Sequence, residues 1–182
     1  MVSGVDEDAA PADSPAALAA VLARLKSEAV VTALAAGPAL DRTTVVVTCD
    51  SVLEMDGVAY GRPADAAEAV LRWRRMRGTT GVVHTGHHVV VVPAEGAPDA
   101  RRTASGVGST VVHFGLPTDA EIDAYVATGE PLRAAGAFSL GGRGGAFVTG
   151  VEGDPHNVVG ISLPLLRDLL ASLGVSWTTL WQ

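Results

Sequence analysis

Runs of β-branched residues, set between segments with helical spacing, constrain the fold of this chain more than any other feature. Residues 43–48 are almost entirely apolar and β-branched, which predicts a strand buried on both faces that leads directly to Cys49 and Asp50. Long β patterns cover residues 80–92 and 107–114, so we expect these two strands to pair in one sheet. Two shorter strands complete the prediction, at residues 147–151 and, as a final edge strand, at 175–181.

Helices are predicted between these strands from capping residues and apolar spacing. Ser14 followed by Pro15 predicts a helix start, because a hydroxyl can cap the first turn and proline is tolerated there. Asp65 and Thr118 are each followed by glutamate three residues later, the pattern of a capping box. A last helix is predicted at about residues 162–173.

Between two short β runs, Asp56-Gly57 predicts a tight hairpin, because both residues tolerate the positive φ angles that such a turn requires. Strands and helices alternate along the chain, so the expected fold class is α/β or mixed α+β. No repeat or interdomain linker is visible, and residues 1–182 are predicted to form a single domain.

Composition narrows the functional classes. The formal net charge of −7 has the wrong sign for a protein that holds a long phosphate backbone, so no nucleic acid partner is expected, while small anionic ligands stay possible. Cys49 is the only cysteine, which suits a reducing compartment. No stretch approaches the roughly 20 apolar residues of a membrane span. We therefore expect a cytoplasmic protein with no membrane partner.

Three sets of residues could carry chemistry. Asp50 stands where the first predicted strand ends, the usual place for functional side chains in α/β proteins, although a turn carboxylate is the alternative. The acidic cluster at 6–8, which includes Glu7, could hold a hard divalent cation or simply be solvated. Lys26 and Arg62 could neutralise phosphate charge, although most such residues face water.

Two other groups invite a functional interpretation. The segment Gly141–Gly145 could let the backbone approach a ligand, but it lacks the Lys-Ser/Thr ending of a phosphate-binding loop. His84 and His88 share one face of their predicted strand and His87 takes the other, and no zinc-ligand spacing is present. A zinc site is therefore not predicted.

Motifs in a characteristic order run along nearly the whole chain. They are VSGVDED (2–8), CDSVLEMDG (49–57), GRP (61–63), MRGTTGVVHTGH (76–87), EIDAYVATGEP (121–131) and GDPHNVVGISLPLL (153–166). In order and spacing they resemble the Maf family of nucleoside triphosphate pyrophosphatases, in its actinobacterial branch.

The resemblance implies hydrolysis of a nucleoside triphosphate to the monophosphate and pyrophosphate, on an elongated mixed α/β fold with a cleft between two lobes. It also implies a divalent cation, Mg²⁺ or Mn²⁺, with Glu7 and Asp50 as the metal-associated carboxylates. Asp50 matches the carboxylate that activates the attacking water. Lys26 and Arg62 match the positions that meet the triphosphate, and Ser51 matches a position that helps to choose the base. A homodimer is a further implication, although no surface pattern predicts one.

Three departures from the family pattern qualify these implications. Family members open with a strand and a Ser-x-Ser-Pro-Arg-Arg type motif, and this sequence begins after it, so a weakened sheet is expected. Arg62 replaces a lysine, which keeps the charge but changes the geometry. Gly141 stands where relatives use a larger polar residue to contact the base, so the preferred base is not predicted.

The main hypothesis is therefore a metal-dependent nucleotide pyrophosphatase that clears non-standard or excess triphosphates. The alternative is a catalytically weakened nucleotide-binding protein with a regulatory role, for example in septum formation. A third hypothesis is a non-functional fragment. Two explanations for the missing opening motif stay open: a start codon assigned too late, or a true loss of the first strand. The former is favoured.

Overall fold

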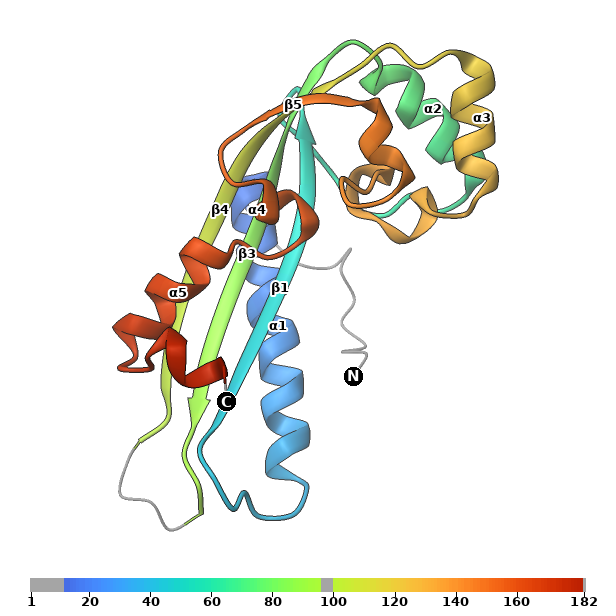
Figure 1. Cartoon of the computed structure of the whole chain (residues 1–182). Helices are drawn as coiled ribbons and strands as arrows, with labels where there is room; N and C mark the ends of the chain where they lie inside the picture. The colour runs from blue at the N-terminus through green and yellow to red at the C-terminus, as the bar shows by residue number, and fades with distance from the viewer. Residues whose placement is uncertain (1–11, 96–99, 182) are drawn as a thin grey trace.

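A computed structural model describes residues 12–95 and 100–181, and every structural statement below refers to these ranges. Its centre is one sheet in which all neighbouring strands are antiparallel, in the order β2-β1-β3-β4-β5 (Figure 1). The strands are β1 (Thr44–Met55), β2 (Val58–Tyr60), β3 (Thr80–Val92), β4 (Arg102–Phe114) and β5 (Val148–Glu152). The three long strands β1, β3 and β4 give the molecule its elongated shape.

One face of the sheet is covered by α1 (Pro15–Ala35), which packs on β1 and β3. The side chain of Ser14 accepts a hydrogen bond from the Ala17 N–H and so caps the helix, as its sequence predicts. The helix lies very close to the sheet at Gly86, where an added Cβ would stand 2.2 Å from the Ala19 carbonyl oxygen. Glycine at this position therefore allows the close approach of helix and sheet.

The opposite face is covered by α4 (Pro155–Val159) and α5 (Leu163–Ser172), which pack on β3 and β4. Ser162 caps α5 by accepting from the Leu165 N–H. Leucines of α5 enclose a small apolar cluster with β3, formed by Val89, Val91, Leu166, Leu170 and Leu173. Burial of this cluster stabilises the end of the sheet that is distant from the hairpin between β1 and β2.

A second lobe lies at the hairpin end of the sheet and contains α2 (Ala66–Met76), α3 (Asp119–Ala127) and the short 3₁₀ helices η1 (Pro131–Arg133), η2 (Ala135–Ala137) and η3 (Arg143–Phe147) (Figure 1). Its core is centred on Trp73, which is fully buried and makes edge contacts with Phe114, Tyr125 and Phe147. Leu53 of β1 and Val83 of β3 belong to the same cluster. The sheet therefore runs from one lobe into the other.

Most of the predicted elements are confirmed. The Asp56-Gly57 hairpin has φ angles of 51° and 77° and joins β1 to β2. Thr118 and Glu121 form the predicted capping box of α3. The two long β patterns pair with each other as β3 and β4. The fold class, α/β with a single sheet and flanking helices, is likewise confirmed.

Three expectations are wrong. The first predicted strand does not end at Asp50 but continues to Met55, because β3 pairs with β1 without interruption from Thr44 to Glu54. That strand is also not buried on both faces: Val47 keeps 37% of its surface exposed. The C-terminal segment is not an edge strand but a 3₁₀ helix, η4 (Trp177–Trp181), which packs next to α5.

The outer edge of β1 explains the exposure along this strand. Within the described ranges, β1 pairs with β3 along one edge, whereas on its other edge it pairs with β2 through Leu53, Glu54 and Met55 only.

None of the helices in the described ranges is long and apolar enough to cross a membrane.

Candidate active site

Asp50 and Lys26 form an ion pair between β1 and α1. Alternation along β1 directs Thr48 and Asp50 to the face that α1 covers, and the Thr48 hydroxyl donates to the Ala23 carbonyl at 2.8 Å. One helical turn further along α1, the Lys26 ammonium contacts the Asp50 carboxylate. The exposed fractions of the two side chains are 22% and 9%. The pair is therefore partly shielded from water, where electrostatic interactions are stronger than on an open surface.

The neighbouring thiol of Cys49 points to the opposite face of β1. Burial, together with the nearby charge of Asp50, raises the pKa of Cys49 to about 11. The thiol is therefore protonated at neutral pH and is a poor nucleophile. Of the polar residues at this part of β1, the one suited to act as a base at neutral pH is Asp50.

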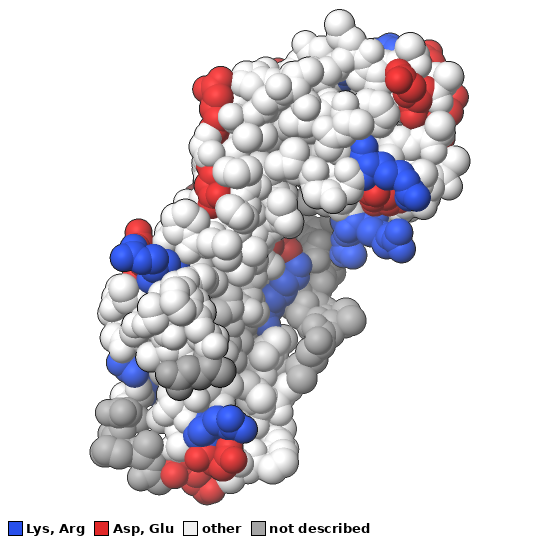
Figure 2. All heavy atoms as spheres, in the orientation of Figure 1, with Lys and Arg blue, Asp and Glu red and all other residues white. Residues whose placement is uncertain are grey.

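Arg62 is exposed and lies in the turn between β2 and α2, at the second lobe, whereas Lys26 lies on α1 and Asp50 on β1. Figure 2 shows this side of the molecule hollowed between the two lobes, with cationic and acidic side chains gathered in the hollow and on its rim. The predicted cleft between two lobes is thus present in the shape of the molecule. A ligand held there would contact side chains from both lobes.

Ser51 lies on the other face of β1 from Asp50, toward α4. Its hydroxyl is 2.8 Å from the Thr85 hydroxyl, and Thr85 donates its own proton to the Asn157 carbonyl at 2.8 Å. Because Thr85 has a single hydroxyl proton, Ser51 must be the donor in the Ser51–Thr85 hydrogen bond. The sequence-predicted residues Asp50 and Ser51 are therefore chain neighbours that serve opposite faces of the sheet.

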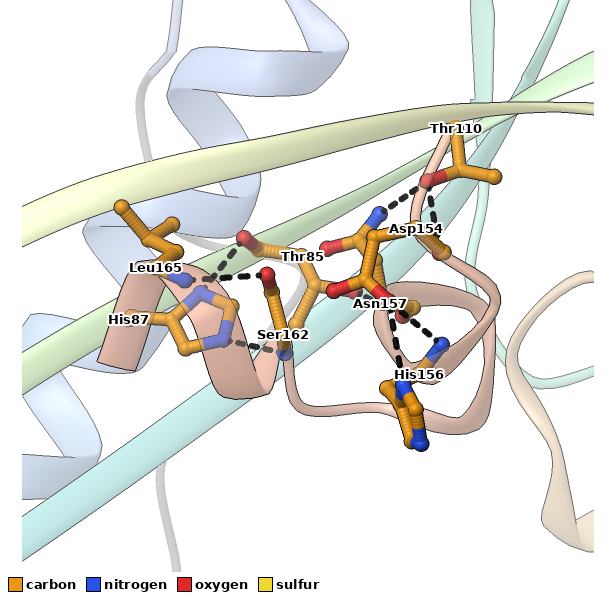
Figure 3. A network of polar contacts seen from close by, with 8 residues as sticks. All are labelled: Thr85, His87, Thr110, Asp154, His156, Asn157, Ser162 and Leu165. Carbon is orange, nitrogen blue, oxygen red and sulfur yellow. Dashed lines mark hydrogen bonds and ion pairs between the residues drawn. The ribbon is translucent and has the colours of Figure 1, made fainter. Parts of the chain in front are cut away.

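The network that continues from Thr85 holds α4 and the start of α5 against the sheet (Figure 3). Asn157 is fully buried and donates to the Val83 carbonyl and to the Thr110 hydroxyl, at 3.0 and 3.2 Å. The Ser162 N–H donates to Nε2 of His87 at 2.8 Å, which requires that nitrogen to carry no proton. Burial lowers the pKa of His87, and the neutral ring is the form that this network needs.

Gly141 lies in a turn that is organised around the carboxylate of Glu130. This carboxylate accepts hydrogen bonds from the Tyr125 hydroxyl and from the N–H groups of Arg143 and Gly144, at 2.8, 3.1 and 3.1 Å. Burial opposes ionisation of Glu130, but these hydrogen bonds outweigh it and lower its pKa. A Cβ added at Gly142 would stand 2.5 Å from Glu130, whereas one added at Gly141 would meet nothing within 4 Å.

This arrangement assigns a structural role to much of the glycine-rich segment. Two of its backbone N–H groups already bind an internal anion, the Glu130 carboxylate, so they are not available to a phosphate. Within residues 12–95 and 100–181, no group of three or more His, Cys, Asp or Glu side chains could hold a metal ion. Glu7, the other predicted metal-associated residue, lies outside the described residues.

Sequence reasoning missed two residues that shape this region, Arg72 and Glu130. Arg72 is buried on the inner face of α2, beside the apolar side chains of Ala69, Trp73 and Met76. The sequence does contain a signal for this role: an arginine stands among apolar residues of a predicted helix, four residues after Glu68. A buried guanidinium requires partners, and Glu68 is within reach. Glu130 stands inside the motif EIDAYVATGEP, and nothing local in the sequence connects it to Arg143 and Gly144.

Comparison with known proteins gives a consistent result. The family model described as "Maf-like protein" matches residues 1–173. A protein of Salinispora tropica is 54% identical over all of this chain and 77% of its own length, and one of Streptomyces coelicolor is 53% identical over all of this chain and 82% of its own length. A Cutibacterium acnes protein is 50% identical, again over all of this chain and 84% of its own length. All three are named nucleoside triphosphate pyrophosphatase.

Proposed function

The chain belongs to the Maf family, and we propose that it hydrolyses nucleoside triphosphates to nucleoside monophosphates and pyrophosphate. Relatives that carry this name are 50–54% identical to it over the full chain, which is the observation that carries the proposal. The partly buried pair of Lys26 and Asp50 supports it, because a base and a cation are the groups that this chemistry needs.

In the proposed reaction the Asp50 carboxylate accepts a proton from a water molecule as that water attacks the α-phosphorus. The bond between the α-phosphorus and the oxygen that bridges to the β-phosphorus breaks, and pyrophosphate leaves with that oxygen and its electron pair. Lys26 exchanges the Asp50 carboxylate for a phosphate oxygen, which offsets the charge that develops on the leaving group. Arg62 approaches the same phosphates from the second lobe and can bind two oxygens at once.

A divalent cation, Mg²⁺ or Mn²⁺, is part of this proposal. The donor set of the described residues suits a magnesium-like ion that is held by one or two carboxylates and completed by substrate phosphates and water, because Asp50 offers one carboxylate and no cluster of three ligands surrounds it. Such an ion neutralises phosphate charge and polarises the phosphoryl group. The role of Glu7 as a second carboxylate ligand of this ion stays a prediction.

We place the substrates among non-standard or excess nucleotides and the protein in the cytoplasm. The single cysteine, Cys49, supports a reducing compartment. Homodimer formation stays a prediction from the family resemblance. Because Gly141 leaves open space next to its Cα, the described residues do not define a preferred base, and a panel of nucleotides is the appropriate substrate set.

The test is pyrophosphate release from a panel of nucleoside triphosphates with Mg²⁺ or Mn²⁺, in the wild type and in Asp50→Asn. We expect Asp50→Asn to lower turnover by at least about 10²-fold, the range for loss of a general base. Asp56→Asn is the matched control, since Asp56 lies in the exposed hairpin and asparagine also tolerates its positive φ. Equal turnover in wild type and Asp50→Asn would reject the mechanism. Triphosphate binding with no product in the wild type would favour the regulatory alternative.

A further inference from the structure

Arg72 is a buried cation on the otherwise apolar inner face of α2. It is 6% exposed, and Ala69, Trp73 and Met76 on the same face are fully buried. Burying a guanidinium costs free energy unless its donors are paired, so a leucine or methionine would suit this position better for packing alone. The partners of Arg72 therefore indicate what it does.

Those partners lie within residues 60–68, on both sides of Arg62 in the sequence. One guanidinium nitrogen of Arg72 donates to the Gly61 carbonyl at 2.5 Å, and another donates to Glu68 at 2.5 Å. The guanidinium carbon also stands 5.0 Å from the centre of the Tyr60 ring, within the range of a cation–π contact. The second oxygen of Glu68 accepts from the Ala64 N–H at 2.7 Å.

The Arg72–Glu68 pair thus holds both ends of the four-residue turn from Gly61 to Ala64. The Gly61 carbonyl accepts a second hydrogen bond, at 3.0 Å, from the Gly136 N–H of η2. Inside the turn Pro63 is buried, whereas Arg62 is exposed. The outcome is an exposed guanidinium on a backbone that is restrained immediately before and after it.

We propose that Arg72, together with Glu68, is a positioning residue that presents Arg62 to the polyphosphate chain of the substrate. This inference rests on the proposed function, in which Arg62 meets the phosphates. Holding the backbone in advance lowers the conformational entropy that binding would otherwise cost, and keeps the Arg62 guanidinium within reach of two phosphate oxygens. Lysine could not replace Arg72, because a single ammonium cannot span Gly61 and Glu68 as the planar fork does.

The test measures binding of inorganic tripolyphosphate to the full chain by calorimetry, for wild type, Arg72→Met, Arg62→Ala and the double variant. We expect Arg72→Met to weaken binding by about tenfold, in line with loss of one preorganised charge-assisted contact. In the Arg62→Ala background the same change should have almost no further effect, because Arg72 acts through Arg62. Additive losses in the double variant would overturn the inference.

Arg77→Met is the matched control. Arg77 directly follows the same helix, but it donates to Asp119 and to the Pro117 carbonyl, on the side away from the Gly61–Ala64 turn. Its loss should leave tripolyphosphate affinity unchanged. If Arg77→Met and Arg72→Met weaken binding equally, the effect is one of lobe stability or net charge, and the positioning role is wrong.

Hydrogen exchange and a milder variant keep the inference testable if Arg72→Met folds poorly. Glu68 is 45% exposed, so Glu68→Gln leaves a solvated side chain and should fold. It should speed exchange of the Ala64 N–H and weaken tripolyphosphate binding by about threefold. Faster exchange with unchanged affinity would mean that the pair is only structural. Wild-type protein that binds tripolyphosphate but never releases pyrophosphate would instead reject the proposed function and leave the positioning role standing.

Discussion

The two faces of the sheet use polar groups in different ways. Under α1, Lys26 and Asp50 form a partly accessible pair of opposite charges. Under α4 and α5, the side chains of Asn157 and His87 are buried, and they form hydrogen bonds with backbone groups and a hydroxyl. The charged pair is therefore accessible to a ligand, whereas the buried hydrogen bonds hold α4 and α5 against the sheet.

The difference arises within three residues of one strand. Asp50 faces α1, while Cys49 and Ser51 on either side face the opposite helices. Because side chains alternate along a strand, a single strand can serve a reactive face and a structural face at once. The comparison predicts that substitutions under α1 change turnover, whereas substitutions under α4 change stability.

The largest effect is expected at Lys26. Lys26→Met removes the cation that pairs with Asp50 and, in the proposed reaction, offsets charge on the leaving pyrophosphate. Pyrophosphate release per folded molecule should decrease by about 10²–10³-fold, the cost of losing one preorganised stabilising group. The matched control is Arg24→Gln on the same helix, because the Arg24–Glu28 pair is about half exposed and contributes little. Loss of activity in both variants would contradict the distinction between the two faces.

A smaller effect, on stability and not on turnover, is expected at Asn157. Asn157→Ala leaves the Val83 carbonyl and the Thr110 hydroxyl without their donor in the interior, which should lower the free energy of unfolding by about 2 kcal/mol. Denaturant unfolding measures this change. His156→Ala serves as control because the neighbouring His156 side chain is 59% exposed. A variant as stable as wild type would show that the network does not hold α4.

The smallest effect is a pH dependence from His87. Its folded-state pKa lies below the ordinary value because of burial, so the unfolded chain binds the proton more readily. The free energy of unfolding should therefore be highest above about pH 6.5 and decrease as the pH falls through that value toward the folded pKa. Protonation of Nε2 would also oppose the Ser162 N–H that donates to it.

His87→Gln should flatten part of this pH dependence, because glutamine can accept from Ser162 without titrating. The measurement is denaturant unfolding between pH 5 and pH 8 for both proteins. Burial also lowers the pKa of His88, so a residual slope of the same sign is expected in the variant. An identical slope in wild type and His87→Gln would show that His87 does not contribute.

Much of the secondary structure could be predicted because its causes are local. Ser14, Thr118 and the Asp56-Gly57 turn act on residues within four positions of themselves, and each appears where its sequence pattern places it. The strand that carries Asp50 could not be bounded in this way. Its length depends on pairing with β3, whose paired residues lie between 28 and 48 positions away in the sequence.

The candidate site, too, has features that the sequence predicts and features that depend on contacts between distant segments. Residue types and motif order determined the family, the nomination of Asp50, Lys26 and Arg62, and the chemistry that a carboxylate with two cations can perform. Only the tertiary structure decided that Asp50 lies in mid-strand against Lys26, that Ser51 serves the other face, and that buried Arg72 holds the turn around Arg62. The physical reason is that local patterns set backbone conformation over a few residues, whereas a site forms from contacts between distant segments, which exist only after the sheet and its two lobes have packed.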